Sequence, residues 1–272
     1  MLFEKYEIKC EGSTNGAILY TYILDNSPEI NINERPLVLL CPGGGYEMTS
    51  DREGETVAMR FLAMGYHAAV LRYSVKPAVF PTALCELGKA VLLIRENAEK
   101  WFVDKGKIVV SGYSAGGHLA ASYGCFWNKP FLAASLQTTA EALKPNGMIL
   151  AYPVITSGEY AHHDSFKNLL GEAYDEKREE VSLEKLADEN FPKTFVWHTY
   201  EDGCVPPQNS LLLVNALVAH HVSTEFHMFA KGGHGLSVAD RLAEIGDYGV
   251  EKTCQPWVEL AHTWMETQIV EE

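Results

Sequence analysis

The sequence of 272 residues lacks the features that mark membrane-spanning and nucleic-acid-binding proteins. No apolar run approaches the roughly 18–20 residues that are needed to cross a bilayer. Basic residues are few, with 22 Lys and Arg against 36 Asp and Glu, which gives a formal charge of −14. Such a surface repels a phosphate backbone and an anionic membrane. We therefore expect neither a nucleic-acid partner nor a membrane partner.

The six cysteines form no C-x-x-C pair and no regular framework. A disulfide scaffold or a zinc ribbon needs such spacing, so we expect reduced, mostly buried thiols and no metal site. The amino terminus, MLFEKYEIKC, lacks a basic start followed by an apolar core, so no secretory signal is predicted. These absences favour a cytoplasmic protein.

What the chain does have is a regular alternation of short apolar runs with helical patterns. Strands are predicted at 37–41, 68–71, 108–110, 148–152, 194–197 and 225–229, and helices at 52–64, 82–101, from 114, 208–220 and 255–267. This alternation predicts an α/β fold, with a mostly parallel central sheet and helices on both faces. We expect residues 1–272 to form one domain.

Two segments depart from this alternation. Within about residues 1–30, the runs 7–10 and 18–23 predict an antiparallel hairpin on the sheet edge. The charged segment of about 156–192 has no strand of its own, and we interpret it as an insertion over the strand ends, with a small lid as one candidate role.

A glycine-flanked serine follows the apolar run 108–110. Gly112-Tyr113-Ser114-Ala115-Gly116 matches G-x-S-x-G between a predicted strand and a predicted helix. This context permits a tight elbow that lifts the hydroxyl of Ser114 clear of the backbone, as a nucleophile requires. The alternative is an ordinary glycine turn with a helix-capping serine.

A serine nucleophile needs a base, and ten histidines are available. His234 lies in a glycine turn directly after the strand 225–229, at the carboxyl end of a strand like Ser114. His227 lies within that strand, and His118 is one helical turn beyond Ser114, where a core or supporting role is expected. His162 and His163 are adjacent but lack spaced ligands, which favours a solvated pair over a metal site. We therefore predict His234 as the base.

The acid that orients such a base is predicted at Asp202. It follows the strand 194–197 and precedes Gly203, again at the carboxyl end of a strand. Glu201 is the adjacent rival, and Asp240 is weaker because it follows His234 in the chain. The predicted catalytic residues are therefore Ser114, Asp202 and His234.

A second glycine loop, Pro42-Gly43-Gly44-Gly45-Tyr46, follows the strand 37–41. Consecutive glycines expose backbone N–H groups that bind a developing oxyanion, and the N–H of Ala115 supplies another. A phosphate cradle is the rival use, but the P-loop Lys and Ser/Thr are absent. A mere tight turn is the simplest alternative.

These four segments resemble a known family. The PGGGY loop, the GYSAGGH elbow, HTYEDGCVPPQNS and FAKGGHG are similar to those of small α/β-hydrolase esterases related to acetylxylan esterases and hormone-sensitive-lipase-like carboxylesterases. The likeness covers about residues 35–240 and includes DSFKNLLG at 164–171. It implies the α/β-hydrolase fold, the Ser114–Asp202–His234 triad, and oxyanion donors at Gly43, Gly44 and Ala115. Pro42 stands where many relatives have histidine, so Gly45 is an alternative donor.

The resemblance implies a serine esterase of short-chain, acetyl-type esters, with a carbohydrate such as an acetylated xylan oligosaccharide as substrate and no cofactor. Expected substrate contacts are Gly45, Tyr46 and Tyr113, and Trp127 or Tyr160 at the rim is a further stacking candidate. The alternatives are a general carboxylesterase or lipase, a serine peptidase or amidase, and a non-catalytic binding protein. A homodimer is also compatible with the edge hairpin.

Overall fold

The computed structural model describes residues 1–14 and 16–271, and the strands in this part of the chain form one eight-stranded sheet. In spatial order, its strands are β1 (Leu2–Glu7), β2 (Ile18–Ile23), β4 (His67–Arg72), β3 (Arg35–Cys41), β5 (Val103–Tyr113), β6 (Gly147–Ala151), β7 (Thr194–Thr199) and β8 (Thr224–Phe229). All neighbours from β4 to β8 are parallel, whereas β1 and β2 are antiparallel. Every strand predicted between 37 and 229 overlaps an observed strand.

The edge hairpin is confirmed, but its first strand was predicted at the wrong residues. β1 covers Leu2–Glu7 rather than 7–10, and β2 pairs with both β1 and β4. Cys10 lies in a turn, because its N–H donates to Ser13 Oγ and its carbonyl accepts from the N–H of Ser13. Its backbone is therefore not available for strand pairing.

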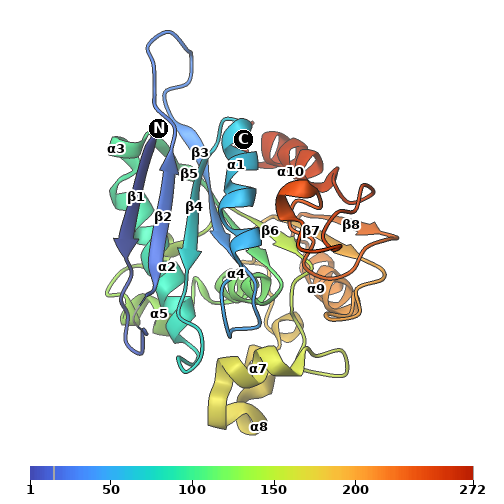
Figure 1. Cartoon of the computed structure of the whole chain (residues 1–272). Coiled ribbons are helices and arrows are strands. Elements are labelled where there is room, and N and C mark those ends of the chain that lie inside the picture. Colours follow the sequence, from blue (N-terminus) through green and yellow to red (C-terminus); the bar gives the residue numbers. More distant parts are fainter. Residues whose placement is uncertain (15, 272) are drawn as a thin grey trace.

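Helices cover both faces of the sheet, as predicted (Figure 1). Successive strand side chains point to opposite faces, so Leu37 and Leu39 join one core cluster while Val38 and Leu40 join the other. The first cluster includes residues of α2 (Thr82–Glu96), α4 (Ala115–Phe126) and α9 (Gln208–Ala219). The second includes residues of α1 (Glu55–Ala63) and α10 (Trp257–Met265).

The remaining helical elements are short. The helix predicted at 82–101 divides at Asn97 into α2 and α3 (Ala98–Trp101), and the one predicted at 52–64 begins as a 3-10 turn, η1 (Asp51–Glu53). The other short elements are α5 (Pro130–Ser135), α6 (Ala140–Leu143), η5 (Arg241–Ala243) and the π-helical η6 (Glu266–Val270).

The insertion of about 156–192 is helical throughout its regular elements, which are α7 (His163–Leu170), η2 (Gly171–Ala173), α8 (Tyr174–Lys177), η3 (Arg178–Val181) and η4 (Leu183–Lys185). Figure 1 places α7 and α8 beyond the end of the sheet toward which the β4 arrow points. Phe166, Val181 and Leu183 are buried in the core shared with α4 and α9. The segment therefore packs onto the domain, and its movement as a lid stays a prediction.

Across residues 1–14 and 16–271, no helix is long and apolar enough to cross a membrane. All six cysteines are free, and four of them are buried: Cys41, Cys85, Cys125 and Cys254.

Candidate active site

Ser114 occupies a strained turn between β5 and α4. Its φ of 54° lies in the left-handed region, which is rare for a residue with a side chain. The flanking glycines make this turn possible: a Cβ on Gly112 would lie 2.2 Å from the carbonyl oxygen of Gly116, and one on Gly116 would lie 2.0 Å from that of Cys41. The close approach predicted from G-x-S-x-G is therefore observed.

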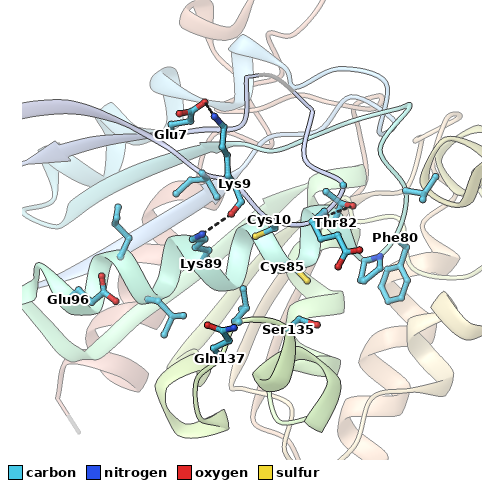
Figure 2. A pocket seen from close by; sticks show the side chains of 18 residues that line it. Glu7, Lys9, Cys10, Phe80, Thr82, Cys85, Lys89, Glu96, Ser135 and Gln137 are labelled. Carbon is cyan, nitrogen blue, oxygen red and sulfur yellow. Dashed lines mark hydrogen bonds and ion pairs between the residues drawn. The ribbon is translucent and has the colours of Figure 1, made fainter.

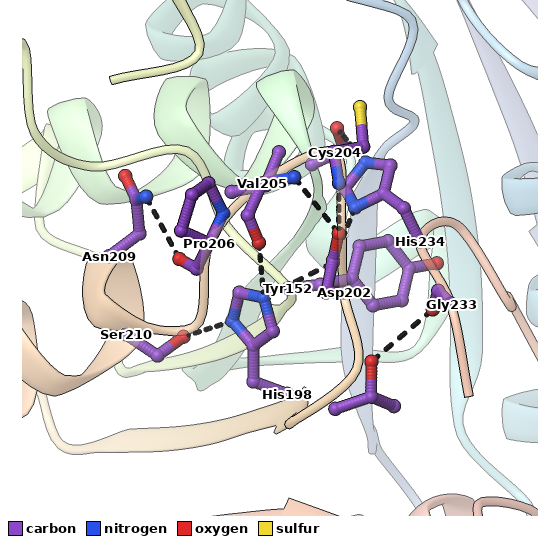
Figure 3. A network of polar contacts seen from close by, with 12 residues as sticks. Tyr152, His198, Asp202, Cys204, Val205, Pro206, Asn209, Ser210, Gly233 and His234 are labelled. Atoms are coloured by element: carbon purple, nitrogen blue, oxygen red, sulfur yellow. Dashed lines mark hydrogen bonds and ion pairs between the residues drawn. The ribbon is translucent and has the colours of Figure 1, made fainter. Parts of the chain in front are cut away.

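The structure brings the three predicted catalytic residues into one hydrogen-bonded chain, and Figure 3 shows its Asp202 and His234 part. Ser114 Oγ lies 2.7 Å from His234 Nε2, and His234 Nδ1 lies 2.7 Å from Asp202 Oδ2. The three residues follow β5, β8 and β7 at their carboxyl ends, as expected for a parallel sheet. With the Nδ1 proton donated to Asp202, the Nε2 of His234 accepts the proton of the Ser114 hydroxyl.

Asp202 is held by donors on both carboxylate oxygens. Its Oδ1 accepts the N–H groups of Cys204 and Val205, each at 2.9 Å, and its Oδ2 accepts from His234 and from His198. Burial alone raises the pKa of Asp202, but the hydrogen bonds from His198 and His234 outweigh it and hold this pKa well below its usual range. The carboxylate is therefore ionised at neutral pH.

The rival acids make contacts elsewhere. Glu201 forms an ion pair with Lys231 at 2.6 Å, and its side chain is exposed. Asp240 contacts Arg60 and accepts the N–H of Leu242 at the start of η5. Neither residue has a hydrogen bond to His234 among the described contacts.

The rival bases are also occupied. His227 lies on β8 and contacts Glu225 at 2.7 Å. His118 is buried, with Nδ1 2.9 Å from the Tyr46 hydroxyl and Nε2 2.9 Å from the carbonyl oxygen of Val181. Burial lowers the pKa of His118 to about 4, so it is a neutral core histidine.

The solvated pair predicted at His162 and His163 is only half correct. His163 is exposed, but His162 is half-buried, with Nδ1 2.8 Å from Ser165 Oγ. Burial and then the charge of His234 lower the pKa of His162. Within the described ranges, no group of three or more His, Cys, Asp or Glu residues is arranged to hold a metal ion.

One N–H group of the glycine loop is already hydrogen-bonded within the protein. The N–H of Gly43 donates to Glu53 Oε2 at 2.7 Å, so it is already used and the assignment of Gly43 as an oxyanion donor is corrected. Ala115 begins α4, and the first N–H bonded within that helix comes from His118. The N–H of Ala115 therefore precedes the helical hydrogen bonds and has no partner within the helix. Gly44, at a φ of 133°, follows Gly43 in the loop.

Glu53 is a site residue that the sequence did not reveal. It lies in η1 and is 4% exposed, although charges in a short helical turn are usually solvated. Its Oε1 accepts the hydroxyl of Tyr152 at 2.7 Å, and that hydroxyl accepts the N–H of Ser237 at 2.9 Å. The ring of Tyr152 packs edge-on against His234, at 5.2 Å between centroids. Glu53 thus connects the glycine loop to the histidine loop.

The predicted aromatic substrate contacts are buried. Tyr46 is 3% exposed and holds His118, while Tyr113 is fully buried in the cluster of α1 and α10 and accepts the hydroxyl of Ser111. Strand alternation directs Tyr113 into the cluster of α1 and α10, where its ring contacts Tyr152 and Trp257. Both assignments are corrected. Gly45 lies at the loop surface, and its carbonyl oxygen accepts from Asn168 at 2.8 Å.

The rim aromatics also have structural contacts. Trp127 is 8% exposed, and its indole N–H donates to the carbonyl oxygen of Asn190 at 3.1 Å. Tyr160 is half-buried, and its carbonyl oxygen accepts from Asn209. Neither contact indicates a sugar-stacking role.

A large cavity of about 810 Å³ lies away from Ser114, between the end of β1 and the start of α2 (Figure 2). Cys10, Thr82, Cys85 and Lys89 are among its lining residues. None of the predicted site residues lines it.

The curated relatives of this chain include a xylanase, two esterases and an acetylxylan esterase. Endo-1,4-beta-xylanase B of Butyrivibrio fibrisolvens is 38% identical over 234 residues, which cover 81% of this chain and 36% of that protein. The curated relatives are much longer, and the chain spans only between a quarter and just over a third of their length.

Two solved structures match over most of both chains. The acetyl ester-xyloside bifunctional hydrolase from Caldicellulosiruptor lactoaceticus has 34% identity and a TM-score of 0.80, covering 92% of this chain and 88% of that one. An α/β hydrolase from a Medee basin deep-sea metagenome library has the same identity and TM-score, covering 99% and 98%. These matches and the sheet order confirm the predicted α/β-hydrolase fold. The BD-FAE family model matches residues 26–217, which is more than half of the sequence, and this chain therefore belongs to the BD-FAE family.

Proposed function

We propose that this chain is a serine esterase that hydrolyses short acetyl-type esters of carbohydrates, such as acetylated xylan oligosaccharides. The observation that carries the proposal is the pair of 2.7 Å contacts that join Ser114 Oγ, His234 and Asp202. Such a chain activates a hydroxyl that is otherwise a weak nucleophile at neutral pH.

In the first step, Ser114 Oγ attacks the ester carbonyl carbon while His234 Nε2 takes the hydroxyl proton. The carbonyl oxygen becomes an oxyanion, for which the N–H groups of Gly44 and Ala115 are the proposed donors, with Gly45 as the alternative to Gly44. Collapse of this intermediate breaks the bond to the alcohol, and His234 returns the proton to the leaving oxygen. The acyl group is then bonded to Ser114.

In the second step, water attacks the acyl carbon and His234 takes a proton from it. The bond between the acyl carbon and Ser114 Oγ breaks, His234 returns the proton to Ser114, and the free acid leaves. Asp202 holds the imidazole in the required tautomer and stabilises its charged form throughout. These steps need no metal or organic cofactor.

The carbohydrate substrate rests on the relatives. The C. lactoaceticus hydrolase is described as acting on acetyl esters and xylosides, and the B. fibrisolvens relative as a xylanase. Xylan in plant walls carries acetyl esters on a neutral sugar, which suits a chain with a formal charge of −14. The cytoplasmic compartment and a homodimer stay predictions.

A panel of acetylated xylo-oligosaccharides, longer acyl esters and peptide amides tests this proposal. We expect fastest turnover of the acetylated sugars, a loss of at least about 10³-fold in kcat for Ser114→Ala, and little change for the control Ser122→Ala, about two helical turns along α4. Preference for acyl chains of about eight carbons or more would favour a general carboxylesterase or lipase. Faster cleavage of amides would favour a peptidase, and inactivity on every substrate would favour a binding protein.

A further inference from the structure

A second buried histidine contacts the carboxylate of Asp202. His198 lies near the end of β7, and its side chain is fully buried. Its Nε2 is 3.2 Å from Asp202 Oδ2 and 3.0 Å from the carbonyl oxygen of Val205, and its Nδ1 is 2.7 Å from Ser210 Oγ. In Figure 3, Asp202 lies between the rings of His198 and His234.

These contacts assign the proton of His198. A backbone carbonyl oxygen and an ionised carboxylate only accept hydrogen bonds, so Nε2 must carry the proton that is shared between Val205 and Asp202. In the neutral ring Nδ1 is then an acceptor, and the Ser210 hydroxyl on α9 donates to it. One neutral tautomer accounts for all three contacts.

The shared oxygen makes His198 relevant to the reaction. Asp202 Oδ2 accepts from His234 Nδ1 at 2.7 Å and also from His198, while Oδ1 is filled by two backbone N–H groups. The carboxylate can therefore rotate only if the two hydrogen bonds to Oδ1 break. His198 supplies the remaining donor, on the side of Oδ2 away from the histidine loop.

We propose that His198 is a positioning residue that holds Asp202 Oδ2 toward His234 and, by donating to that oxygen, sets the pH below which the site loses activity. This inference rests on the proposed esterase function. The acid-side loss follows from proton uptake by the His234–Asp202 pair. A donor to the carboxylate disfavours that uptake, whichever partner holds the proton. Removing the donor therefore moves the acid limb of the profile to higher pH.

Other titratable groups also face this pair, and they are the same in wild type and variant. They come from the insertion, the segments before and after β8, the end of β6 and η1: His162, Asp164, Cys204, Tyr248, Tyr152, Glu53 and the Glu201–Lys231 ion pair. A comparison of variants at position 198 alone leaves their contribution constant.

The test uses two side chains of similar shape that differ in their donor. His198→Gln places an amide N–H near the position of Nε2, whereas His198→Met has no donor. We expect His198→Met to raise the midpoint of the acid limb of kcat/KM by about half a pH unit or more, and to lower kcat roughly 3–10-fold. His198→Gln should keep the wild-type acid limb and most of kcat.

His67→Met is the matched control for lost stability. His67 is a buried histidine at the start of β4, bonded to the backbone of Leu24 and Phe102 at the opposite end of the sheet. We expect it to lower Tm without moving the acid limb. If His198→Met lowers Tm and leaves the limb at its wild-type pH, His198 is only a packing residue and the inference is overturned.

A measurement on the wild-type chain does not depend on how any variant folds. The ¹⁵N shifts of His198 should report a neutral ring with the proton on Nε2, and a proton on Nδ1 would overturn the hydrogen-bond assignment. If the wild type hydrolyses no ester in a Ser114-dependent way, the proposed function fails. If hydrolysis depends on Ser114 but His198→Met leaves the acid limb of the pH profile at its wild-type position, only the inference on His198 fails.

Discussion

Two buried carboxylates hold the loops of the candidate site: Asp202 bonds to His234, and Glu53 accepts the N–H of Gly43. Each accepts hydrogen bonds from separate segments of the chain, and a buried carboxylate that loses such donors is strongly destabilised. Individual side chains therefore both orient the site and stabilise the fold around it. Substitutions at the two positions separate these effects.

Asp202→Asn tests the pH dependence of stability. The folded pKa of Asp202 is held below its unfolded value of about 3.9, so its ionised form stabilises the fold above about pH 4, and this contribution is lost as the pH falls toward the folded pKa. Urea unfolding should give the largest stability difference between wild type and Asp202→Asn near about pH 7, with a smaller difference below about pH 4. A difference that does not vary with pH would contradict this account. We also expect kcat to fall on the order of 10⁴-fold.

Glu53 should affect turnover more than substrate binding. Glu53→Leu removes the acceptor of the Gly43 N–H and of the Tyr152 hydroxyl, so the glycine loop loses an anchor next to the proposed oxyanion donors. We expect kcat to fall roughly 10–100-fold with KM nearly unchanged. Removal of a whole oxyanion donor lowers kcat by about 10²–10³-fold, and here the donors are only displaced. Glu53→Gln retains an acceptor for Gly43 and should recover most of kcat. Equal kcat in Glu53→Leu and wild type, measured below both Tm values, would exclude this role.

At the scale of elements, the elbow depends on how closely β5, α4 and the β3 loop approach one another. Gly116 places α4 directly against the carbonyl oxygens of Cys41 and Pro42, where no Cβ fits. The same approach brings the start of α4 and its N–H groups beside the glycine loop. The turn that holds Ser114 therefore depends on contact between these elements and not on the serine alone.

Gly116→Ala should be strongly destabilising. Its Cβ would lie 2.0 Å and 2.4 Å from two backbone oxygens, which move only if α4 or the loop shifts. We expect a loss of about 3 kcal/mol and a Tm lower by about 6–12 °C. Gly203→Ala is the control, because a Cβ there meets nothing within 4 Å. Similar melting of both variants in thermal unfolding would show that the close approach is not needed.

At the scale of the whole molecule, the sheet gathers three loops that are far apart in the sequence. Ser114, Asp202 and His234 each follow a parallel strand, so their motifs and chain order were enough to predict that they meet. Glu53 and His198 were missed because a glutamate in a polar turn and a histidine at a strand end carry no local signal of burial. Tyr46 and Tyr113 were misassigned because their burial depends on contacts with His118, Tyr73 and Trp257.

Net charge is also a property of the whole chain, and it predicts a dependence on salt. With a formal charge of −14, the chain repels an anionic ester and leaves a neutral one unaffected. The kcat/KM for an acetate ester with an anionic leaving group should rise between about 0.01 and 0.15 M salt, because the repulsion is screened. The value for a neutral acetate ester should stay level. A rise of equal size for both esters would point to a cause other than charge.

The most direct test of the central claim is to locate the covalent adduct that forms when a serine oxygen displaces fluoride from a phosphonyl probe. A fluorophosphonate probe reacts with serines that a histidine activates, and peptide mass mapping identifies the labelled residue. We predict a single label on Ser114, retained in Ser122→Ala and abolished in Ser114→Ala and His234→Ala. Labelling of another residue, or labelling that survives Ser114→Ala, would contradict the proposal that Ser114, His234 and Asp202 form the reacting centre.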